Sequence, residues 1–482
     1  MALEDHPGSL VVVTNREPYI DEKTNQGIRR LQSAGGVVSA LDPLLQRSGG
    51  AWVAWGSGSA DRETAPRGIR MVPPNQPKYP LHRVFLSPEE IAGYYNRYSN
   101  QGLWPLSHML IERAQFSREA FHLYRRVNQK FARRVAQMAP RNGSIFSHDY
   151  HLALFPRMIR ELRPDVAVAH FWHIPWPPFT LFRLCPQHQE ITRGLLGADI
   201  LGFQTPQDVD NFLTAVERGL KIPVDRAQGI IQVGTHRVTV RDYPISVDIT
   251  AIEQMVKTPR IQRWTEGIRK RALKHGVSLA ISVDRADYTK GLLQRLEAID
   301  KFFARYPEHH RRITFLQVVV PTRTEVREYR RLYDQFVDAS ARLNNKYGDA
   351  AWTPLIHIRR SIDRPRLMGL FRAAEYALVS SLFDGMNLVA KEFISAQIDN
   401  RGVLLLSDMA GAAQELGEAF HFNPLDPDEV AEQLHRAALT TSADRARRIE
   451  SMREHIHHHT IYDWIAHIVE ALDEVADTYA AR

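Results

Sequence analysis

The chain has 482 residues, of which 44% are hydrophobic and 24% charged, the composition of an ordinary soluble globular protein. This length exceeds what one hydrophobic core usually serves, so we expect two domains of α/β size. The net charge of +7 and the pI near 9.4 come without a block of one sign, because basic and acidic residues mix along segments such as 323–342. This pattern favours a solvated surface that attracts anionic substrates over nucleic acid binding.

The first residues of the chain and its cysteine content indicate a reducing compartment. The first residues carry neither a basic cluster nor an apolar stretch, and no run of 18 apolar residues occurs in the chain. We therefore expect no signal peptide and no membrane span. The single cysteine, Cys185, excludes an internal disulfide and fits a cytoplasmic location, where we expect it to pack rather than react.

The first half alternates apolar strand segments with helices. Strands are expected at 10–13, 51–55, 143–147, 166–172 and 199–203. Helices are expected after Gly35-Gly36, over 118–139 and from about Pro206, and a polar loop containing Gly27 is expected over 17–30. Strands that alternate with helices indicate parallel sheet.

A second series of strands and helices follows a linker that we place near Asp248. Its strands are expected at 277–283, 313–320, 355–358, 376–380 and 403–406. The tail from Ser442 is helical only, so we expect its last helix to cross back to the first domain. The predicted domains are therefore residues 1–248 with about 462–482, and residues 249–461.

Two loops of the second series carry the strongest chemical signal. Arg285 and Lys290 follow the first strand, and the run from Asp384 to Glu392 follows a later one and opens a helix. Both lie at the carboxyl edge of a parallel sheet, where open α/β folds bind ligands. Two cations with the free N–H groups of a helix start fit a nucleotide-sugar diphosphate. The alternatives are an exposed Arg and Lys, an exposed Glu392, and Asp384 as a simple helix N-cap.

Several histidines stand at strand ends or on a late helix. His173 follows a strand and has a satisfied core histidine as its alternative. His148 and His151 flank a turn, but no further ligand set stands nearby, so a structural metal is not expected there. The run 455–459 places His455 and His459 on one helix face, and an exposed polar surface is the default for it.

Several motifs occur together in a fixed order. They are Asn15-Arg16, Ser33-Ala34-Gly35-Gly36, Tyr95-Asn96 with Leu103-Trp104-Pro105, His148-Asp149-Tyr150-His151, His173-Ile174-Pro175, Arg285 with Lys290, Arg323, and the run from Asp384 to Glu392. In this order they resemble the trehalose-6-phosphate synthases, retaining glycosyltransferases of family 20, from Val11 to about Pro427. The resemblance implies the α/β GT-B fold, with two facing Rossmann-like domains and a deep cleft between them.

On the donor side, the resemblance implies that the second domain binds a nucleotide sugar, most simply UDP-glucose. Arg285 and Lys290 would neutralise the leaving diphosphate, and His173 would lie beside the reacting sugar. The remaining donor-binding residues are Gly36, Ile358 through its backbone, Asp384 on sugar hydroxyls, Asn387 and Leu388 through backbone N–H groups, and Glu392 on the ribose. Arg285, Lys290, His173 and Asp384 are the expected catalytic residues.

On the acceptor side, the resemblance implies that the first domain binds a sugar phosphate. Arg16, Tyr95, Trp104 and Arg323 match the phosphate pocket, where Arg16 and Arg323 are expected to approach from the two domains. Asp149 matches an acceptor-sugar contact. Trp55 either faces the acceptor or belongs to the aromatic core.

The sequence departs from the typical pattern at Arg16-Glu17-Pro18-Tyr19, where bacterial members have a short Arg-Ile/Leu-Pro segment. Glucosylglycerol-phosphate synthases share this start, but Gly35-Gly36 and Arg323 favour glucose 6-phosphate as the acceptor. The prediction is an enzyme that makes α,α-trehalose 6-phosphate and UDP, with no cofactor or metal and with no nucleic acid or membrane partner. The alternatives are another phosphorylated acceptor, such as glycerol 3-phosphate, and a non-catalytic regulator. The nucleotide base and the oligomeric state, a homo-oligomer included, stay open.

Overall fold

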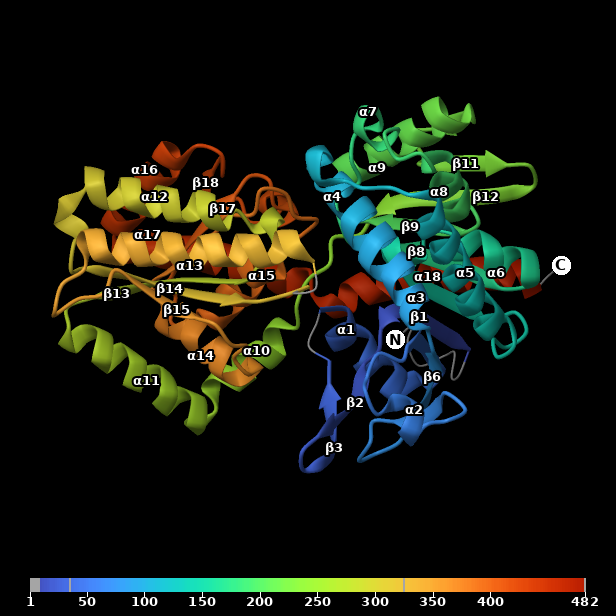
Figure 1. Ribbon diagram of the computed structural model, residues 1–482, viewed down its shortest axis with the longest axis horizontal. Helices are drawn as coiled ribbons and strands as arrows, with labels where there is room; N and C mark the ends of the chain where they lie inside the picture. Colours follow the sequence, from blue (N-terminus) through green and yellow to red (C-terminus); the bar gives the residue numbers. More distant parts are fainter. Residues whose placement is uncertain (1–8, 34–35, 324–325, 481–482) are drawn as a thin grey trace. The chain divides into compact units, whose positions relative to one another are not determined.

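The computed structural model describes residues 9–33, 36–323 and 326–480. Its contacts divide the chain into two compact units (Figure 1). The first unit is Met1–Ile245 together with Ile461–Arg482, and the second unit is Ser246–Thr460. The last helix therefore belongs with the first unit. Gly35, which was expected to open a helix together with Gly36, lies outside the described residues.

A large twisted sheet forms the centre of the first unit. Its strands, in spatial order, are β10 (Val224–Asp225), β11 (Ile230–Val233), β12 (His236–Asp242), β9 (Ile200–Phe203), β8 (Ala167–Phe171), β7 (Ser144–His148), β1 (Leu10–Arg16), β4 (Ala51–Trp55), β6 (Tyr79–Val84) and β5 (Ile69–Val72). From β12 to β6 neighbouring strands are parallel, and the outer pairs are antiparallel. Because the chain builds outward from β1 on both sides, the winding direction reverses between β1 and β7.

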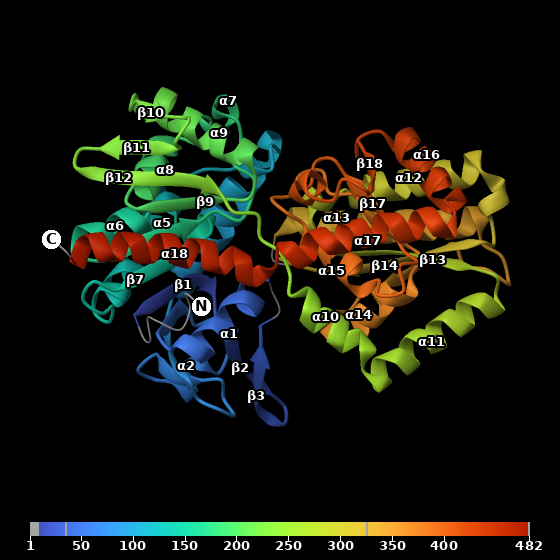
Figure 2. The same cartoon turned by 180° about the vertical axis from the view of Figure 1, so that it is seen from behind.

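Helices cover the two faces of this sheet. They are α1 (Gly36–Ser48), α2 (Asp61–Thr64), α3 (Pro88–Glu90), η1 (Ile91–Leu103), α4 (Trp104–Ser107), η2 (Ile111–Arg113), α5 (Arg118–Ala136), η3 (Tyr150–Leu152), α6 (Phe155–Leu162), α7 (Phe179–Phe182), α8 (His188–Leu195), α9 (Pro206–Ala215), η4 (Val216–Leu220) and α18 (Ile461–Ala480). The hydroxyl groups of Ser117 and Thr205 accept backbone N–H bonds at the starts of α5 and α9, which stabilises both helix ends. Helix α18 contacts β7, β8 and β9 (Figure 2).

The segment expected as a polar loop over 17–30 is largely a β-hairpin. Strands β2 (Tyr19–Thr24) and β3 (Gly27–Gln32) pair antiparallel. Gly27 follows the two-residue turn with a φ of +111°, a conformation that side chains disfavour. Asp21 of this hairpin is buried, and its polar groups have partners. Its backbone N–H donates to Asp61 Oδ1 at 2.9 Å, and its carboxylate lies 3.3 Å from Arg83 Nη1.

The second unit has a sheet in which all strands are parallel. Its spatial order is β15 (Leu355–Ile358), β14 (Ile313–Val320), β13 (Ser278–Arg285), β16 (Tyr376–Val379), β17 (Val403–Ser407) and β18 (Phe420–Phe422). Counted along the chain this order is 3-2-1-4-5-6, the order of a doubly wound dinucleotide-binding fold. The winding direction reverses between β13 and β16, and ligands of such sheets bind outside the carboxyl ends of the strands at that point.

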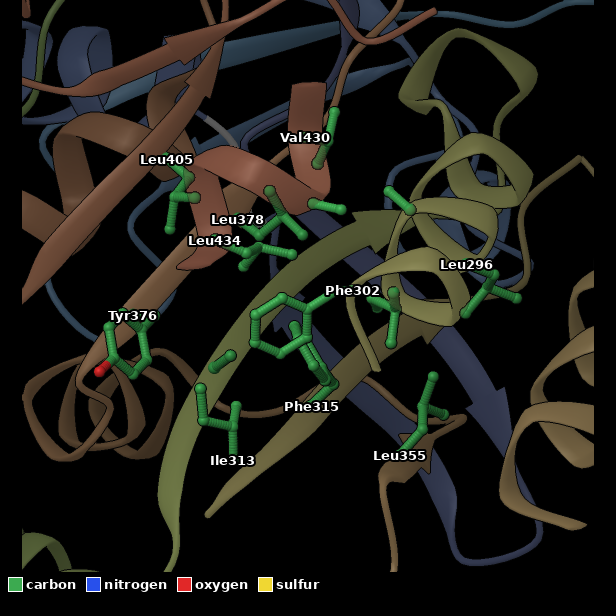
Figure 3. Packing of buried hydrophobic residues seen from close by; sticks show 14 of the residues in the cluster. Leu296, Phe302, Ile313, Phe315, Leu355, Tyr376, Leu378, Leu405, Val430 and Leu434 are labelled. Atoms are coloured by element: carbon green, nitrogen blue, oxygen red, sulfur yellow. The ribbon is translucent and has the colours of Figure 1, made fainter. Parts of the chain in front are cut away.

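Helices cover the second sheet and complete its core. They are α10 (Ile249–Lys257), α11 (Pro259–Lys274), η5 (Tyr288–Lys290), α12 (Leu292–Arg305), η6 (Pro307–His309), α13 (Arg327–Tyr347), α14 (Arg364–Ala373), α15 (Leu388–Ala396), η7 (Gly411–Gln414), α16 (Pro427–Leu439) and α17 (Ser442–His458). Figure 3 shows Phe302 of α12 and Leu434 of α16 packed over Phe315, Leu378 and Leu405 of the strands. The apolar strand segments are thus buried by the amphipathic helices that follow them.

The predicted α/β class with parallel sheets is confirmed in both units. No helix within the described residues combines the length and the apolar character that crossing a membrane requires.

Candidate active site

The reversal point of the second sheet brings two loops together. Arg285 ends β13 and is exposed, and Lys290 ends η5 a few residues later. Gly291 has a φ of +63°, and a Cβ there would lie 2.1 Å from the carbonyl oxygen of Ser380, so only glycine permits this approach. The Ser380 hydroxyl donates to the Lys290 carbonyl at 3.0 Å, and Leu382 N donates to Thr289 O at 2.7 Å. The loop that carries Lys290 is therefore fixed to the end of β16.

A polar cluster forms where these loops meet. Lys290 Nζ lies 2.5 Å from Asp384 Oδ2, and both side chains are at most 15% exposed. Asn387 Nδ2 donates to the same carboxylate oxygen at 2.9 Å, and the Ser381 hydroxyl donates to it at 3.2 Å. We call Lys290, Ser381, Asp384 and Asn387 the lysine cluster. It holds a positive charge beside several hydroxyl-binding groups at the ligand edge of the sheet.

The start of α15 is capped by Asn387 and not by Asp384. Asn387 has a left-handed backbone conformation, and its Oδ1 accepts the N–H of Ala390 at 3.2 Å. The alternative role of Asp384 as a helix N-cap is therefore wrong. This leaves the Asp384 carboxylate to the lysine cluster, while the helix start directs backbone N–H groups outward.

Arg323 lies against the loop that carries Lys290. Its Nη1 donates to Asp287 Oδ2 at 3.2 Å and also contacts the Tyr329 hydroxyl, and Asp287 is fully buried. Burial alone would raise the pKa of Asp287, but the charges of Arg323 and Arg285 outweigh it and hold that pKa below its ordinary value. Arg323, with a φ of +47°, is thus an oriented and largely buried cation.

The remaining predicted donor residues occupy different places. Ile358 ends β15 and is half-buried, and Gly36 begins α1 in the first unit. Glu392, one turn into α15, has Arg364 Nη2 at 3.7 Å. Burial raises the pKa of the Glu392 carboxyl, and Arg364 only partly opposes this.

In the first unit, three of the predicted acceptor residues stand at the ends of β1, β4 and β7, while Tyr95 lies in η1 and Trp104 in α4. Arg16 ends β1 with its side chain exposed, and the neighbouring Asn15 accepts a hydrogen bond from Tyr94 at 2.8 Å. Trp55 ends β4, and Asp149 follows β7 with a φ of +73°. These ends flank the reversal point between β1 and β7, the place where the fold binds ligands.

An aromatic series connects several of these side chains. The rings of Trp55 and Tyr95 lie 5.4 Å apart, and Tyr95 stacks on His151 at 5.7 Å. His151 Nδ1 is 3.8 Å from Asp149 Oδ2, and the backbone N–H of His173 donates to Asp149 Oδ1 at 3.3 Å. Trp55, Tyr95, Asp149 and His173 thus form one continuous group, which includes His151, a residue not predicted as a site member.

Trp104 lies deeper than the aromatic series. It is 7% exposed and packs against His108 and Tyr150, with ring centroids 4.3 and 5.7 Å away. The ring centroid of Tyr150 in turn lies 4.0 Å from that of His151, so Tyr150 connects Trp104 to the aromatic series.

Three histidines line the ends of β7 and β8, and of these His148 and His170 are buried whereas His173 is half-buried. His148 Nδ1 lies 3.1 Å from His173 Nε2, and His170 Nδ1 lies 2.9 Å from the Ser147 hydroxyl. Burial lowers the pKa of His173 to about 3 and that of His170 to about 3. His173 is therefore neutral at physiological pH and can hydrogen-bond a substrate without carrying charge.

Trp464 of α18 packs on this histidine group, with ring centroids 6.4 Å from His148 and 6.2 Å from His173. Sequence reasoning found neither Trp464 nor the pairing of His148 with His173. The tryptophan stands in an ordinary amphipathic helix, and no local pattern links it to a residue far earlier in the chain.

Comparison with known proteins gives a match over nearly the whole chain. The model of the family described as Glycosyltransferase family 20 matches residues 8–474. A bifunctional trehalose-6-phosphate synthase/phosphatase of Thermoproteus tenax is 36% identical over 471 residues, which cover 94% of this chain but 62% of that protein. The chain thus spans less than two thirds of this longer relative. A trehalose-6-phosphate synthase of Mycolicibacterium smegmatis is 35% identical over 97% of this chain and 93% of its own.

Solved structures with bound small molecules are also similar. An E. coli structure, described as trehalose-6-phosphate bound with UDP-2-fluoro glucose, has a TM-score of 0.86 and 32% identity and covers 96% of this chain and 98% of its own. A UDP-forming α,α-trehalose-phosphate synthase of Burkholderia xenovorans in complex with glucose-6-phosphate has a TM-score of 0.86 and 30% identity and covers 97% of this chain and 100% of its own.

Proposed function

This chain belongs to glycosyltransferase family 20, and we propose that it transfers glucose from UDP-glucose to glucose 6-phosphate, giving α,α-trehalose 6-phosphate and UDP. The observation that carries the proposal is the lysine cluster at the reversal point of the 3-2-1-4-5-6 sheet, with Arg285 beside it. The bound molecules of the E. coli and B. xenovorans structures support the choice of donor and acceptor.

On the donor side, Lys290 and Arg285 neutralise the diphosphate as it leaves. Negative charge on the leaving group grows in the transition state, so a fixed cation stabilises that state more than the ground state. Asp384 both orients Lys290 and accepts bonds from the glucosyl hydroxyls, since a carboxylate has several acceptor positions. The start of α15, with Asn387 and Leu388, gives backbone N–H groups, and Glu392 binds the ribose.

On the acceptor side, Arg16 and Arg323 bind the phosphate of glucose 6-phosphate, which suits the bidentate geometry of guanidinium groups. Tyr95 and Trp104 contribute hydrogen-bond donors and apolar contact, and Asp149 binds sugar hydroxyls. The contact between Trp55 and Tyr95 supports a position of Trp55 beside the acceptor rather than in the aromatic core.

The proposed mechanism keeps the α-configuration of the donor. The acceptor hydroxyl oxygen attacks the anomeric carbon from the face that the diphosphate leaves, and its proton passes to an oxygen of the departing phosphate. His173 is half-buried and its pKa is lowered by desolvation to about 3, so the neutral ring positions the donor sugar by hydrogen bonding rather than by proton transfer. The cations of Arg285 and Lys290 neutralise the leaving diphosphate, as a divalent metal does in other transferases.

An assay of UDP release tests the reaction. The purified protein is incubated with UDP-glucose and, in separate reactions, with glucose 6-phosphate, glycerol 3-phosphate or glucose. We expect release with glucose 6-phosphate and a product that a trehalose-6-phosphate phosphatase converts to trehalose.

Two other results would replace the proposal. Release with glycerol 3-phosphate alone would identify a glucosylglycerol-phosphate synthase, the alternative that the Arg16-Glu17-Pro18-Tyr19 start supports. Binding of UDP-glucose without turnover on any acceptor would identify a regulator. Parallel reactions with ADP-glucose and GDP-glucose determine the base preference.

A further inference from the structure

A glutamate and a histidine that are neighbours in η6 meet a second histidine from a distant helix of the second unit. Glu308 and His309 belong to η6, and His435 belongs to α16. Each offers one ligand atom, and these atoms all lie within 4.8 Å of one another. We propose that this His–Glu cluster (Glu308, His309, His435) binds a divalent transition metal of the zinc class and fixes η6 to α16.

The distances fit a common ion. His309 Nε2 lies 3.0 Å from His435 Nδ1, and Glu308 Oε1 lies 3.7 Å from the same His435 nitrogen. Two nitrogens that each bind zinc at 2.0–2.1 Å in a tetrahedral arrangement stand about 3.3 Å apart. The two rings therefore need to separate by only a few tenths of an ångström, and the exposed Glu308 can complete a three-residue set with one position left for water.

Aromatic neighbours hold both imidazole rings in place. The His435 ring lies on Tyr306 with a centroid distance of 3.9 Å and an interplanar angle of 6°. The His309 ring lies on Phe302 at 4.9 Å and 16°, and Phe302 is itself part of the core in Figure 3. Ligand side chains that are already ordered lose little rotamer freedom on binding, which favours affinity.

The two rings are directed at each other, whereas nearby histidines have other partners. His310 Nε2 bonds to the carbonyl oxygen of Phe303 at 2.8 Å. In the run 455–459, His457 bonds to Glu253 at 3.0 Å and His455 to Glu415 at 3.3 Å. Over the described ranges, the His–Glu cluster is the one group of three ligands that geometry brings together, and its two segments, η6 and α16, are far apart in the sequence.

The position of the cluster indicates a structural role. Helix α12 leaves the carboxyl edge of the sheet after β13, and η6 leads into the start of β14, so η6 lies at the opposite, amino edge. The lysine cluster stands at the carboxyl edge. A metal at the amino edge would connect segments more than 120 residues apart, and bound metal stabilises the folded state by its binding free energy.

Metal titration of a suitable variant tests the proposal. His457, His458 and His459 are first changed to Gln, because an exposed histidine run binds metal weakly by itself. The chelator-treated protein is then titrated with Zn²⁺ by calorimetry and with Co²⁺ by visible absorption. We expect one ion per chain, d–d bands of low-symmetry cobalt, and a melting temperature that rises with Zn²⁺.

Single substitutions in that background locate the ion. His435→Gln should weaken binding by at least about 10- to 100-fold, the effect that loss of even an indirect metal contact produces, and should abolish the Zn²⁺-dependent rise in melting temperature. Glu308→Gln, at an exposed residue that leaves the fold intact, should weaken it to a smaller degree, and His310→Gln should leave it unchanged. Absence of stoichiometric binding in the background variant, or equal affinity after His435→Gln, would show that the two imidazoles form only an N–H···N hydrogen bond.

Discussion

Lys290 is the residue on which donor chemistry most depends. Its ammonium group already faces the Asp384 carboxylate at 2.5 Å, and only 13% of its side chain is exposed. A charge held in this way costs little reorganisation when the diphosphate leaves. Its neighbour Arg285 is exposed and can move to meet the substrate.

We expect Lys290→Ala to lower kcat by about 10²-fold or more, because removal of one charge-stabilising donor has this effect in other enzymes. The KM for UDP-glucose should change much less. Steady-state rates of UDP release at saturating donor measure both. Lys346→Ala is the matched control, since this lysine is 53% exposed and pairs with Asp300 on the helix surface. An unchanged kcat in Lys290→Ala would assign the lysine a structural role.

Arg323→Ala should raise the KM for glucose 6-phosphate by about 10- to 150-fold, because a charged hydrogen bond to phosphate contributes about 1.5–3 kcal/mol. The KM for UDP-glucose should stay nearly constant. The variant should also melt at a lower temperature, because the buried Asp287 loses its ion pair with Arg323. Arg323→Lys, which keeps the charge, should restore stability but only part of the acceptor affinity. Loss of donor affinity with an unchanged acceptor KM would contradict the assignment.

At the residue scale, strand ends were predictable and side-chain partners were not. An apolar strand followed by Arg285 and Lys290 indicates a ligand edge, because parallel strands all end there. The sequence offered Asp384 as the cap of α15, whereas the structure shows that Asn387 caps this helix. The contact of Trp464 with His173 depends on tertiary packing, which local patterns do not contain.

At the scale of elements, Glu17 joins three segments that carry predicted site residues. Its Oε1 accepts the N–H of Ser57 at 2.8 Å, just after Trp55, and its Oε2 accepts Arg83 Nε at 2.7 Å. Its carbonyl oxygen accepts the Ser33 hydroxyl at 2.6 Å at the end of the hairpin. The side chain is fully buried. Glu17 thus fixes the loop after β1, which begins at Arg16, to its neighbours.

We expect Glu17 to make stability depend on pH. Burial and the nearby Asp61 raise the pKa of Glu17 from 4.5 to about 8. Between these values the folded state holds a proton that the unfolded state has released, so the free energy of unfolding falls as pH rises from about 4.5 to 8. The contribution is on the order of a few kcal/mol at 1.36 kcal/mol per pKa unit.

Denaturant unfolding of Glu17→Gln across this pH range checks the expectation. The amide keeps the size and one hydrogen-bond acceptor but does not titrate, so the fall in stability with pH should be weaker than in the unaltered chain. Glu22→Gln, at an exposed position of the same hairpin, should keep the full fall. Identical pH profiles for the unaltered chain and Glu17→Gln would show that Glu17 is ionised throughout.

The β2–β3 hairpin was not predicted from the sequence, which favoured a polar loop over 17–30. Its residues are polar on both faces, so they lack the alternation that marks a half-buried strand. Its buried positions are Tyr19 and Asp21, and Asp21 has its partners, Asp61 and Arg83, on other elements. The sequence pattern of such a polar segment favours a loop, because the ion-pair partners that bury it lie elsewhere in the chain.

At the scale of the whole molecule, metal dependence distinguishes the two proposals made above. We expect EDTA to leave kcat unchanged, because Arg285 and Lys290 neutralise the diphosphate. It should lower the melting temperature if the His–Glu cluster carries an ion. UDP release and thermal melting, both measured on the chelator-treated protein, separate the effects. Complete loss of activity that Mg²⁺ restores would reassign Asp149 or Asp384 as a metal ligand.

The family and the fold were largely contained in the sequence. The ordered motifs from Asn15 to Glu392 predicted a family 20 transferase of the GT-B class, and the family model and similar structures confirm it. Strands of alternating α/β units predict well because largely apolar runs such as 313–320 are buried on both faces. The antiparallel edge strands β10, β11 and β5 were not predicted, since they are short and partly exposed.

The attachment of α18 to the first unit sets an order of maturation. Residues 246–460 are synthesised before Ile461, so the second unit can complete its six-stranded sheet while the first unit still lacks its last helix. Until that helix arrives, Phe146, His148 and Phe171 have no Trp464 to cover them. The unit that begins the chain is therefore the last to be finished, and a premature stop after residue 460 would spare the second unit while leaving the histidine-bearing face of the first open to water.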